Sequence, residues 1–176
     1  MNFDTNKFVE YKKLQDTTNI QDCYQHTIQA LKYICSKLEE EMTNYHFMNR
    51  FVENQMNFSY FQLTNDSLKN KKLKIQVIFV HKTCTFEVWI SGYNRKIQKK
   101  YYSSLPNELD VFEKCADPLK NDYLLKKKLS RTLARDDIQS ILLEIKDTIK
   151  TLGTITINIK LYEGIIGNLK VDVISA

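Results

Sequence analysis

Five polar or aromatic side chains are spaced so that one β-sheet would gather them on a single face. Residues 73–80 and 84–91 predict a hairpin in which Gln76 lies opposite Trp89. If residues 58–63 form a neighbouring strand, Tyr60 and Gln62 join the same face. A carboxylate, two amides, a phenol and an indole on one sheet can line a cleft, and from this group we identify four candidate ligand-binding residues: Tyr60, Gln76, Glu87 and Trp89. The simpler interpretation is that a helix covers this face, because sheets often carry a polar second face.

The register of the hairpin follows from its apolar side chains, which alternate with other residues along both strands. A turn centred on Lys82 and Thr83 would place Phe79 opposite Phe86, because side chains directly opposite share a face. A slip of one residue would set every apolar side chain opposite a polar one. The predicted pairs are Phe79 with Phe86, Val77 with Val88, and Ile75 with Ile90.

The same stretch carries a set of motifs: Leu73-Lys74-Ile75, Ile78-Phe79-Val80-His81 and Phe86-Glu87-Val88-Trp89-Ile90-Ser91-Gly92-Tyr93-Asn94, followed by Gln98 and Tyr101. Across residues 57–102 this pattern resembles an uncharacterised bacterial domain-of-unknown-function family. The resemblance implies a small, single-domain, cytoplasmic protein. It implies no activity that can be transferred to residues of this chain.

A basic segment directly after the hairpin is the candidate nucleic-acid site. Asn94 predicts the cap of a helix that runs to about Tyr102, in which cations and tyrosines are interleaved. Cations would contact phosphate and exposed tyrosines would stack on bases, so the candidate nucleic-acid-binding residues are Arg95, Lys96, Lys99 and Lys100. The alternative is a solvated basic helix whose tyrosines face the core. A net charge of +5 permits an anionic ligand or nucleic acid as partner without requiring one.

The order of predicted elements is similar to the core of restriction-endonuclease-like nucleases, which is an analogy of topology alone. Such sites cluster carboxylates to hold Mg²⁺ and usually add a lysine. Glu87 is the only acidic residue in either hairpin strand, and the residue two positions later is Trp89. An active nuclease is therefore not expected. A nucleic-acid-binding protein, or a degenerate nuclease-like enzyme that uses the Glu87 and Trp89 face, stays as the alternative.

No other motif indicates a particular reaction. His26, His46 and His81 lack the spacing of metal ligands, and the sequence has no phosphate-binding glycine loop or nucleophile elbow. We therefore assign no catalytic residue, no metal and no cofactor. The leading hypothesis is a small binding or interaction domain without catalytic activity.

Amphipathic helices are expected to support the sheet. Asp4 predicts the cap of a short helix, and Asn19 the cap of a long one. The long helix carries a stripe at steps of three and four, which indicates packing on a core: Tyr24, Ile28, Leu31, Cys35, Leu38 and Met42. Downstream we predict a basic helix over 123–133, a helix from Asp136 or Asp137 to Gly153, and a strand over 154–161.

The fold expected is a single α+β domain over residues 1–176, with the C-terminal tail, residues 163–176, left unassigned. It is a mainly antiparallel sheet with a central hairpin, residues 73–80 and 84–91, packed by amphipathic helices. A hydrophobic content of 43% and a charged content of 27% are those of a globular domain of this length.

Location is predicted from the cysteines and from apolar patterning. The four cysteines, at positions 23, 35, 84 and 115, are scattered without a CxxC pair, as in reduced proteins. The first residues lack the layout of a signal peptide, and no apolar run approaches the roughly 20 residues of a membrane helix. We therefore expect a cytoplasmic protein without a membrane partner.

Overall fold

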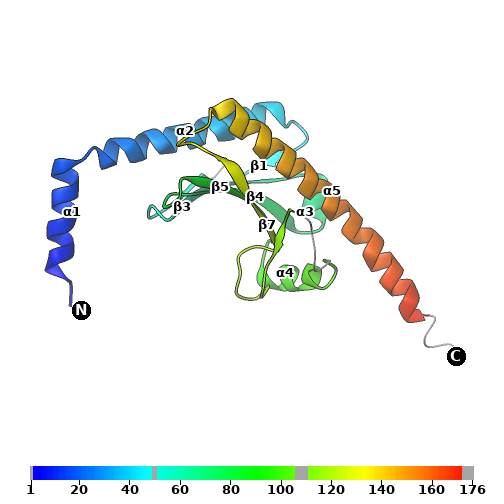
Figure 1. Ribbon diagram of the computed structural model, residues 1–176. Coiled ribbons are helices and arrows are strands. Elements are labelled where there is room, and N and C mark those ends of the chain that lie inside the picture. Colours follow the sequence, from blue (N-terminus) through cyan, green and yellow to red (C-terminus); the bar gives the residue numbers. More distant parts are fainter. Residues whose placement is uncertain (1, 49–50, 106–110, 172–176) are drawn as a thin grey trace.

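The structure is a computed structural model that describes residues 2–48, 51–105 and 111–171, with side chains described as far as residue 156. The described strands form a seven-stranded antiparallel sheet in the order β1-β3-β4-β5-β7-β6, with β2 also paired to β3. The strands are β1 (His46–Phe47), β2 (Val52–Asn54), β3 (Phe58–Thr64), β4 (Leu73–Val80), β5 (Thr85–Gly92), β6 (Glu113–Lys114) and β7 (Leu125–Thr132). The helices are α1 (Thr5–Thr17), α2 (Ile20–Glu41), α3 (Asp66–Asn70), α4 (Arg95–Tyr102) and α5 (Ile138–Val171). The predicted α+β class is confirmed (Figure 1).

The central hairpin has the predicted register. Phe79 pairs with Phe86, and their rings meet edge to face with centroids 5.1 Å apart. The pairs of Val77 with Val88 and Ile75 with Ile90 are also confirmed. Residues 81–84 form the turn, in which Cys84 has a φ of 52°, a left-handed conformation that glycine or asparagine usually supplies. The absence of glycine explains why the turn type could not be predicted.

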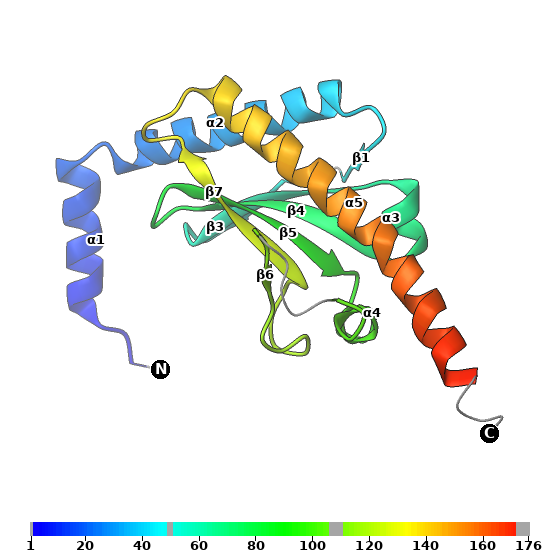
Figure 2. The ribbon, with the colours of Figure 1, turned by 45° about the vertical axis from the view of Figure 1, so that its right-hand side comes forward.

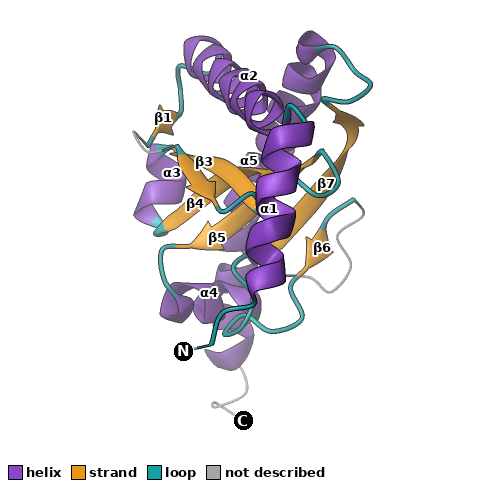
Figure 3. Cartoon of the chain, turned by 90° about the vertical axis from the view of Figure 1, so that its left-hand side faces the viewer, coloured by secondary structure: helices purple, strands orange, loops and turns teal. Residues whose placement is uncertain are grey.

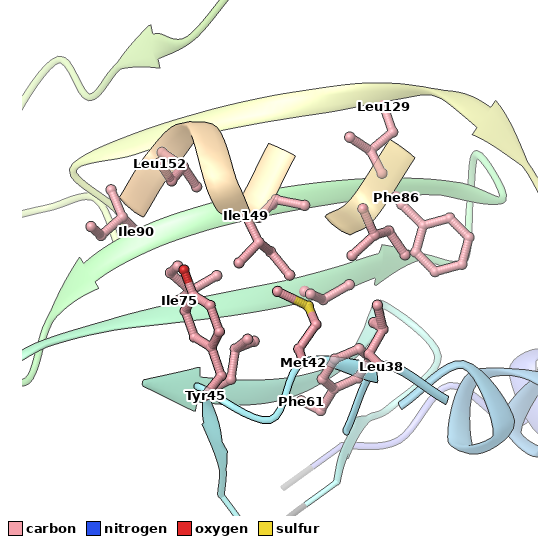
Figure 4. Close-up of a cluster of buried hydrophobic side chains, with 14 of the residues drawn as sticks. Leu38, Met42, Tyr45, Phe61, Ile75, Phe86, Ile90, Leu129, Ile149 and Leu152 are labelled. Carbon is pink, nitrogen blue, oxygen red and sulfur yellow. The ribbon is translucent and has the colours of Figure 1, made fainter. Parts of the chain in front are cut away.

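The hydrophobic core lies between one face of the sheet and the two long helices, α2 and α5 (Figure 2). Figure 4 shows Met42, at the end of α2, and Ile149, from α5, in the same layer as Ile75 and Phe86 of the sheet. All four side chains are at least nine-tenths buried. Burying one such side chain contributes about 1.5–3 kcal/mol. This layer therefore stabilises the sheet, and the sheet in turn positions the side chains on its opposite face.

Residues 125–132 form a strand, so the predicted helix over 123–133 is wrong. Leu125, Leu129 and Leu133 repeat every four residues, which suits a helix, and the lysines between them suit either structure. In the folded chain Leu125 pairs with Ile90, and β7 adds to the outer edge of β5. Pairing with a strand distant in the sequence overrides local preference, which is typical of β structure.

Helix α5 continues to Val171, so the predicted strand over 154–161 is also wrong. Ile149, Leu152 and Thr156 are buried at steps of three and four, which extends the helical stripe past the expected end. Gly153 does not end the helix. A Cβ there would lie 3.0 Å from the hydroxyl of Tyr45, so the glycine admits that ring against α5. Residues 172–176 of the tail lie outside the described residues.

Helix α1 has the predicted cap, since Asp4 accepts a hydrogen bond of 3.0 Å from the backbone of Asn6. Its apolar residues Phe8, Tyr11 and Leu14 are nevertheless exposed, and none of its residues is buried. Figures 1 and 2 show α1 to one side of the sheet and apart from it, and in Figure 3 the helix stands in front of the sheet because that view looks from its side. Among the described helices, α5 included, none combines the length and the apolar character needed to cross a membrane.

Candidate functional site

The face of the sheet opposite α2 and α5 is hollowed by a cavity of about 490 Å³. Its lining residues alternate with core residues along β3, β4 and β5, so their side chains point away from the two helices. The start of α4 and Asp122, in the loop before β7, contribute the remainder of the lining. The cavity therefore has a sheet floor with a helix end and a loop at its rim.

Three of the four candidate ligand-binding residues, Tyr60, Gln76 and Trp89, line this cavity. Gln76 lies opposite Trp89, and Ile78 lies opposite both Tyr60 and Glu87. Glu87 is not one of the lining residues, but its Oε2 accepts a hydrogen bond of 2.7 Å from the indole nitrogen of Trp89. The simpler interpretation expects a helix to cover this face. Helices α2 and α5 do not cover it, because both pack on the other face of the sheet.

A second set of contacts holds the indole of Trp89 from the side of β7. The rings of Trp89 and Tyr123 have centroids 5.2 Å apart. The Tyr123 hydroxyl donates a hydrogen bond of 2.8 Å to Glu113, and Nζ of Lys126 lies 5.0 Å from the centre of the Tyr123 ring. Burial and the bond to Glu113 raise the pKa of Tyr123, so its phenol stays protonated and keeps donating. Trp89 is thus fixed by two neighbours before any ligand arrives.

One end of the cavity is cationic. Lys74 projects from β4 and Arg95 from the first turn of α4, and Arg95 Nη2 donates a hydrogen bond of 2.5 Å to Oδ1 of Asp122. Burial lowers the pKa of Lys74, although the nearby Asp122 carboxylate acts in the opposite direction. Within the described part of the chain, no carboxylate forms an ion pair with Lys74. The ammonium group is therefore half-buried, and no residue that the structure describes forms an ion pair with it.

Hydrogen bonds join the sheet, α4 and the loop before β7 around this end. The Ser91 hydroxyl lies 2.7 Å from Oε1 of Gln76 and 2.7 Å from the carbonyl oxygen of Asp122. The amide nitrogen of Gln98, on α4, donates to two carbonyls of the same loop at 3.0 and 2.6 Å. A Cβ on Gly92 would lie 2.7 Å from the backbone nitrogen of Gln98, so glycine permits the close approach of β5 to α4.

Sequence reasoning missed part of this lining. Lys74 and Ser91 share the alternation that placed Gln76 and Trp89 on one face. The two-residue period of side chains along a strand would therefore have assigned both residues to the lining. Asp122 gives no such signal, because it lies in a loop. Arg95, a candidate nucleic-acid-binding residue, lies at the rim of the cavity beside Asp122.

The remaining nucleic-acid candidates lie apart from the cavity. Lys96, Lys99 and Lys100 are exposed on α4 and do not line it. Tyr101 is 5% exposed, so it belongs to the core and cannot stack on a base. The Tyr102 hydroxyl donates to a backbone carbonyl at 3.3 Å. Tyr102 is half-buried and Tyr93, just before the helix, is exposed, so Tyr101 alone among these tyrosines is withdrawn into the core. Nucleic-acid binding stays a prediction.

His81 lies near the end of the hairpin but packs on the core side, away from the cavity. Its Nε2 lies 2.9 Å from the hydroxyl of Ser59, and its ring contacts Phe79 and Tyr24 at centroid distances of 5.1 and 5.3 Å. Burial lowers the pKa of His81, against an opposite effect of Glu53, so the imidazole favours its neutral form. Across the described ranges, no three histidine, cysteine or acidic side chains are grouped to hold a metal ion.

Comparison with known proteins places the chain at the level of a family. No curated protein and no solved structure matches it. One family does match, over residues 4–159, which takes in every described strand, the cavity and the first part of α5. The chain therefore belongs to the family described as Domain of unknown function (DUF7000).

Proposed function

We propose that this protein is a binding domain without catalytic activity, and that its ligand is a small polar molecule held in the cavity on the open face of the sheet. The observation that carries the proposal is the cavity itself. Its volume of about 490 Å³ falls among those of sites for small molecules, which span roughly 300–1,000 Å³. Aromatic rings, amides and two cations converge on it from three strands and a helix.

The polar groups of the cavity are engaged in ways that favour binding over reaction. The hydroxyl of Ser91 contacts Gln76 and a backbone carbonyl rather than a base. The carboxylate of Asp122 is held by Arg95, and that of Glu87 by Trp89. A nucleophile needs a base within hydrogen-bond reach, and these contacts instead fix the shape of the lining before a ligand enters.

The proposal includes a cytoplasmic location in a bacterial cell. Cys23 and Cys84 are exposed free thiols. Exposed thiols of this kind suit a reducing compartment, where disulfides rarely persist.

Trp89 makes the proposal directly testable, because it is the single tryptophan of the chain and it lines the cavity. A panel of small polar compounds would be screened by tryptophan fluorescence and by thermal shift. Active compounds are expected to lose their effect in Gln62→Phe, which places a ring in the cavity, and to keep it in the control Lys96→Gln on the exposed face of α4. If no compound of any charge alters either signal, the proposal fails. Reproducible turnover that is lost in Glu87→Gln would refute its non-enzymatic part.

A second candidate function is nucleic-acid binding through α4. It is supported by the exposure of Lys96, Lys99 and Lys100 on one short helix. Contacts to phosphate weaken steeply with ionic strength. A mobility-shift titration at increasing salt is expected to show binding that is lost in the triple Lys→Gln variant, and no shift at low salt would reject the idea.

A further inference from the structure

We infer that the ligand of this cavity is a small organic anion that carries a flat ring, with its acidic group at Lys74 and Arg95 and its ring between Tyr60 and Trp89. The inference rests on the proposed function, because it names the class of ligand for the same site. Carboxylate and phosphate are the two acidic groups that would suit the cationic end.

The charges of the lining favour an anion. Lys74, Arg95 and Asp122 are the charged residues that line the cavity, so this end carries a net charge of +1 when Asp122 is paired. Arg95 is already matched by Asp122, whereas Lys74 has no ion-pair partner among the described residues. Holding a half-buried cation without a partner is unfavourable, and a charge-assisted hydrogen bond from a ligand would offset that cost.

The rest of the lining favours a flat ring. Strands β3 and β5 flank β4, so the side chains of Tyr60 and Trp89 rise from strands roughly 10 Å apart, with those of β4 between them. Ile78, opposite Tyr60, and Gln76, opposite Trp89, form the floor between the two rings. A single ring lying on this floor would meet an aromatic side chain on either side, an arrangement in which offset or edge contacts each contribute about 0.5–1.5 kcal/mol.

Two amide groups lie level with Trp89 and next to the cationic end, because Gln76 is opposite Trp89 and two residues from Lys74 on β4. Gln62 and Gln76 lie opposite each other on β3 and β4. Oε1 of Gln76 is occupied by the Ser91 hydroxyl at 2.7 Å, which leaves its amide nitrogen to donate. A polar atom on the ring or on its link to the acidic group would accept from this nitrogen. The order along the cavity is therefore ring, hydrogen-bond acceptor, anion.

The test uses probes that differ by one property at a time. Benzoate and phenyl phosphate carry a ring with each kind of acidic group, benzamide is the neutral counterpart, and acetate and inorganic phosphate lack the ring. Binding is followed in the full chain by the fluorescence of Trp89 and by calorimetry. Benzoate or phenyl phosphate is expected to bind about tenfold more tightly than benzamide, and about tenfold more tightly than acetate or inorganic phosphate, respectively. Whichever of benzoate and phenyl phosphate binds more tightly identifies the acidic group of the ligand.

Two variants of opposite effect make the result independent of folding. Lys74→Gln is expected to weaken the ring anion about tenfold and to leave benzamide unchanged. Asp122→Asn removes the carboxylate that competes at Arg95, so it is expected to tighten the ring anion severalfold, a gain that misfolding cannot produce. Equal affinity for benzoate, phenyl phosphate and benzamide would overturn the inference and leave the proposed function standing. The inference would also be overturned if a neutral compound from the wider panel bound and no anion did.

Discussion

The end of β5 and the start of α4 meet where Gly92 lies against the backbone of Gln98. A Cβ added to Gly92 would be 2.7 Å from the backbone nitrogen of Gln98 and 3.0 Å from the carbonyl oxygen of Asn94. Because both neighbours are backbone atoms, neither can turn aside as the end of a side chain could. The start of α4, which brings Arg95 to the rim of the cavity, can therefore lie this close to β5 only because Gly92 has no side chain.

Gly92→Ala is expected to destabilise the protein by about 1–3 kcal/mol, the usual cost of forcing an extra methyl group into a packed site. It should also weaken ligand binding, because α4 must move away from β5. Urea unfolding followed by Trp89 fluorescence measures the first effect. Gly153→Ala is the control, since its close neighbour is the hydroxyl at the tip of Tyr45, and a change within about 1 kcal/mol is expected there. Equal losses in both variants would contradict the prediction.

Glu144 is expected to stabilise the junction of α5 and β7. Its carboxylate accepts hydrogen bonds from the backbone and hydroxyl of Ser130 at 2.8 and 2.9 Å and from the backbone of Arg131 at 3.0 Å. Burial alone would raise the pKa of Glu144, but these bonds outweigh it and lower the pKa below the ordinary value of 4.5. Glu144→Gln should cost about 1–3 kcal/mol at neutral pH.

The pH dependence of that effect has a definite sign. A carboxyl whose pKa is lowered on folding stabilises fully above its unfolded pKa, and this contribution disappears as the pH falls through the folded value. The stabilities of wild type and Glu144→Gln should therefore converge in acid, as measured by urea unfolding at a series of pH values. Asp147→Asn, at an exposed position one turn along α5, serves as control. A difference that persists unchanged into acid would exclude the assigned role.

His81 is expected to make the fold less stable in mild acid. Because burial lowers its pKa, the unfolded chain takes up a proton first, near the ordinary value of 6.5, and stability falls as the pH drops below that value. His81→Gln keeps a polar group beside Ser59 without titrating. Its Tm should depend less on pH between about 8 and 5.5 than that of wild type. His26→Gln, at an exposed position on α2, should behave as wild type.

Most elements of the fold could be predicted because their signals are local. Asp4 and Asn94 cap helices that begin where expected, and the alternation of β4 and β5 fixed a register that the structure confirms. The two errors fall where one pattern fits two structures. Leu125 and Leu129 are four apart in a strand, and the isoleucines after Gly153 alternate within a helix. For β7 the deciding contact, the pairing of Leu125 with Ile90, lies far away in the sequence.

The cavity was predictable only in part for the same reason. Tyr60, Gln76 and Trp89 come from neighbouring strands, so period two and a register suffice to group them. Lys74, Arg95 and Asp122 meet through a strand, a helix start and a loop, and no spacing in the sequence brings them together. The charged end, on which the ligand class depends, is thus a tertiary feature.

Removing the carboxylate of Glu87 should release the indole that it holds. Glu87→Leu eliminates the acceptor of the 2.7 Å bond from Trp89, so the tryptophan emission should shift to the red as the ring gains freedom and water. Affinity for neutral and anionic ring compounds should fall together, whereas Lys74→Gln affects anions alone. Glu87→Gln retains an acceptor oxygen and should restore much of both signals. Lys128→Gln, across the strand pair from Glu87, is the matched control. An emission and an affinity that stay unchanged in Glu87→Leu would show that Tyr123 alone positions the ring.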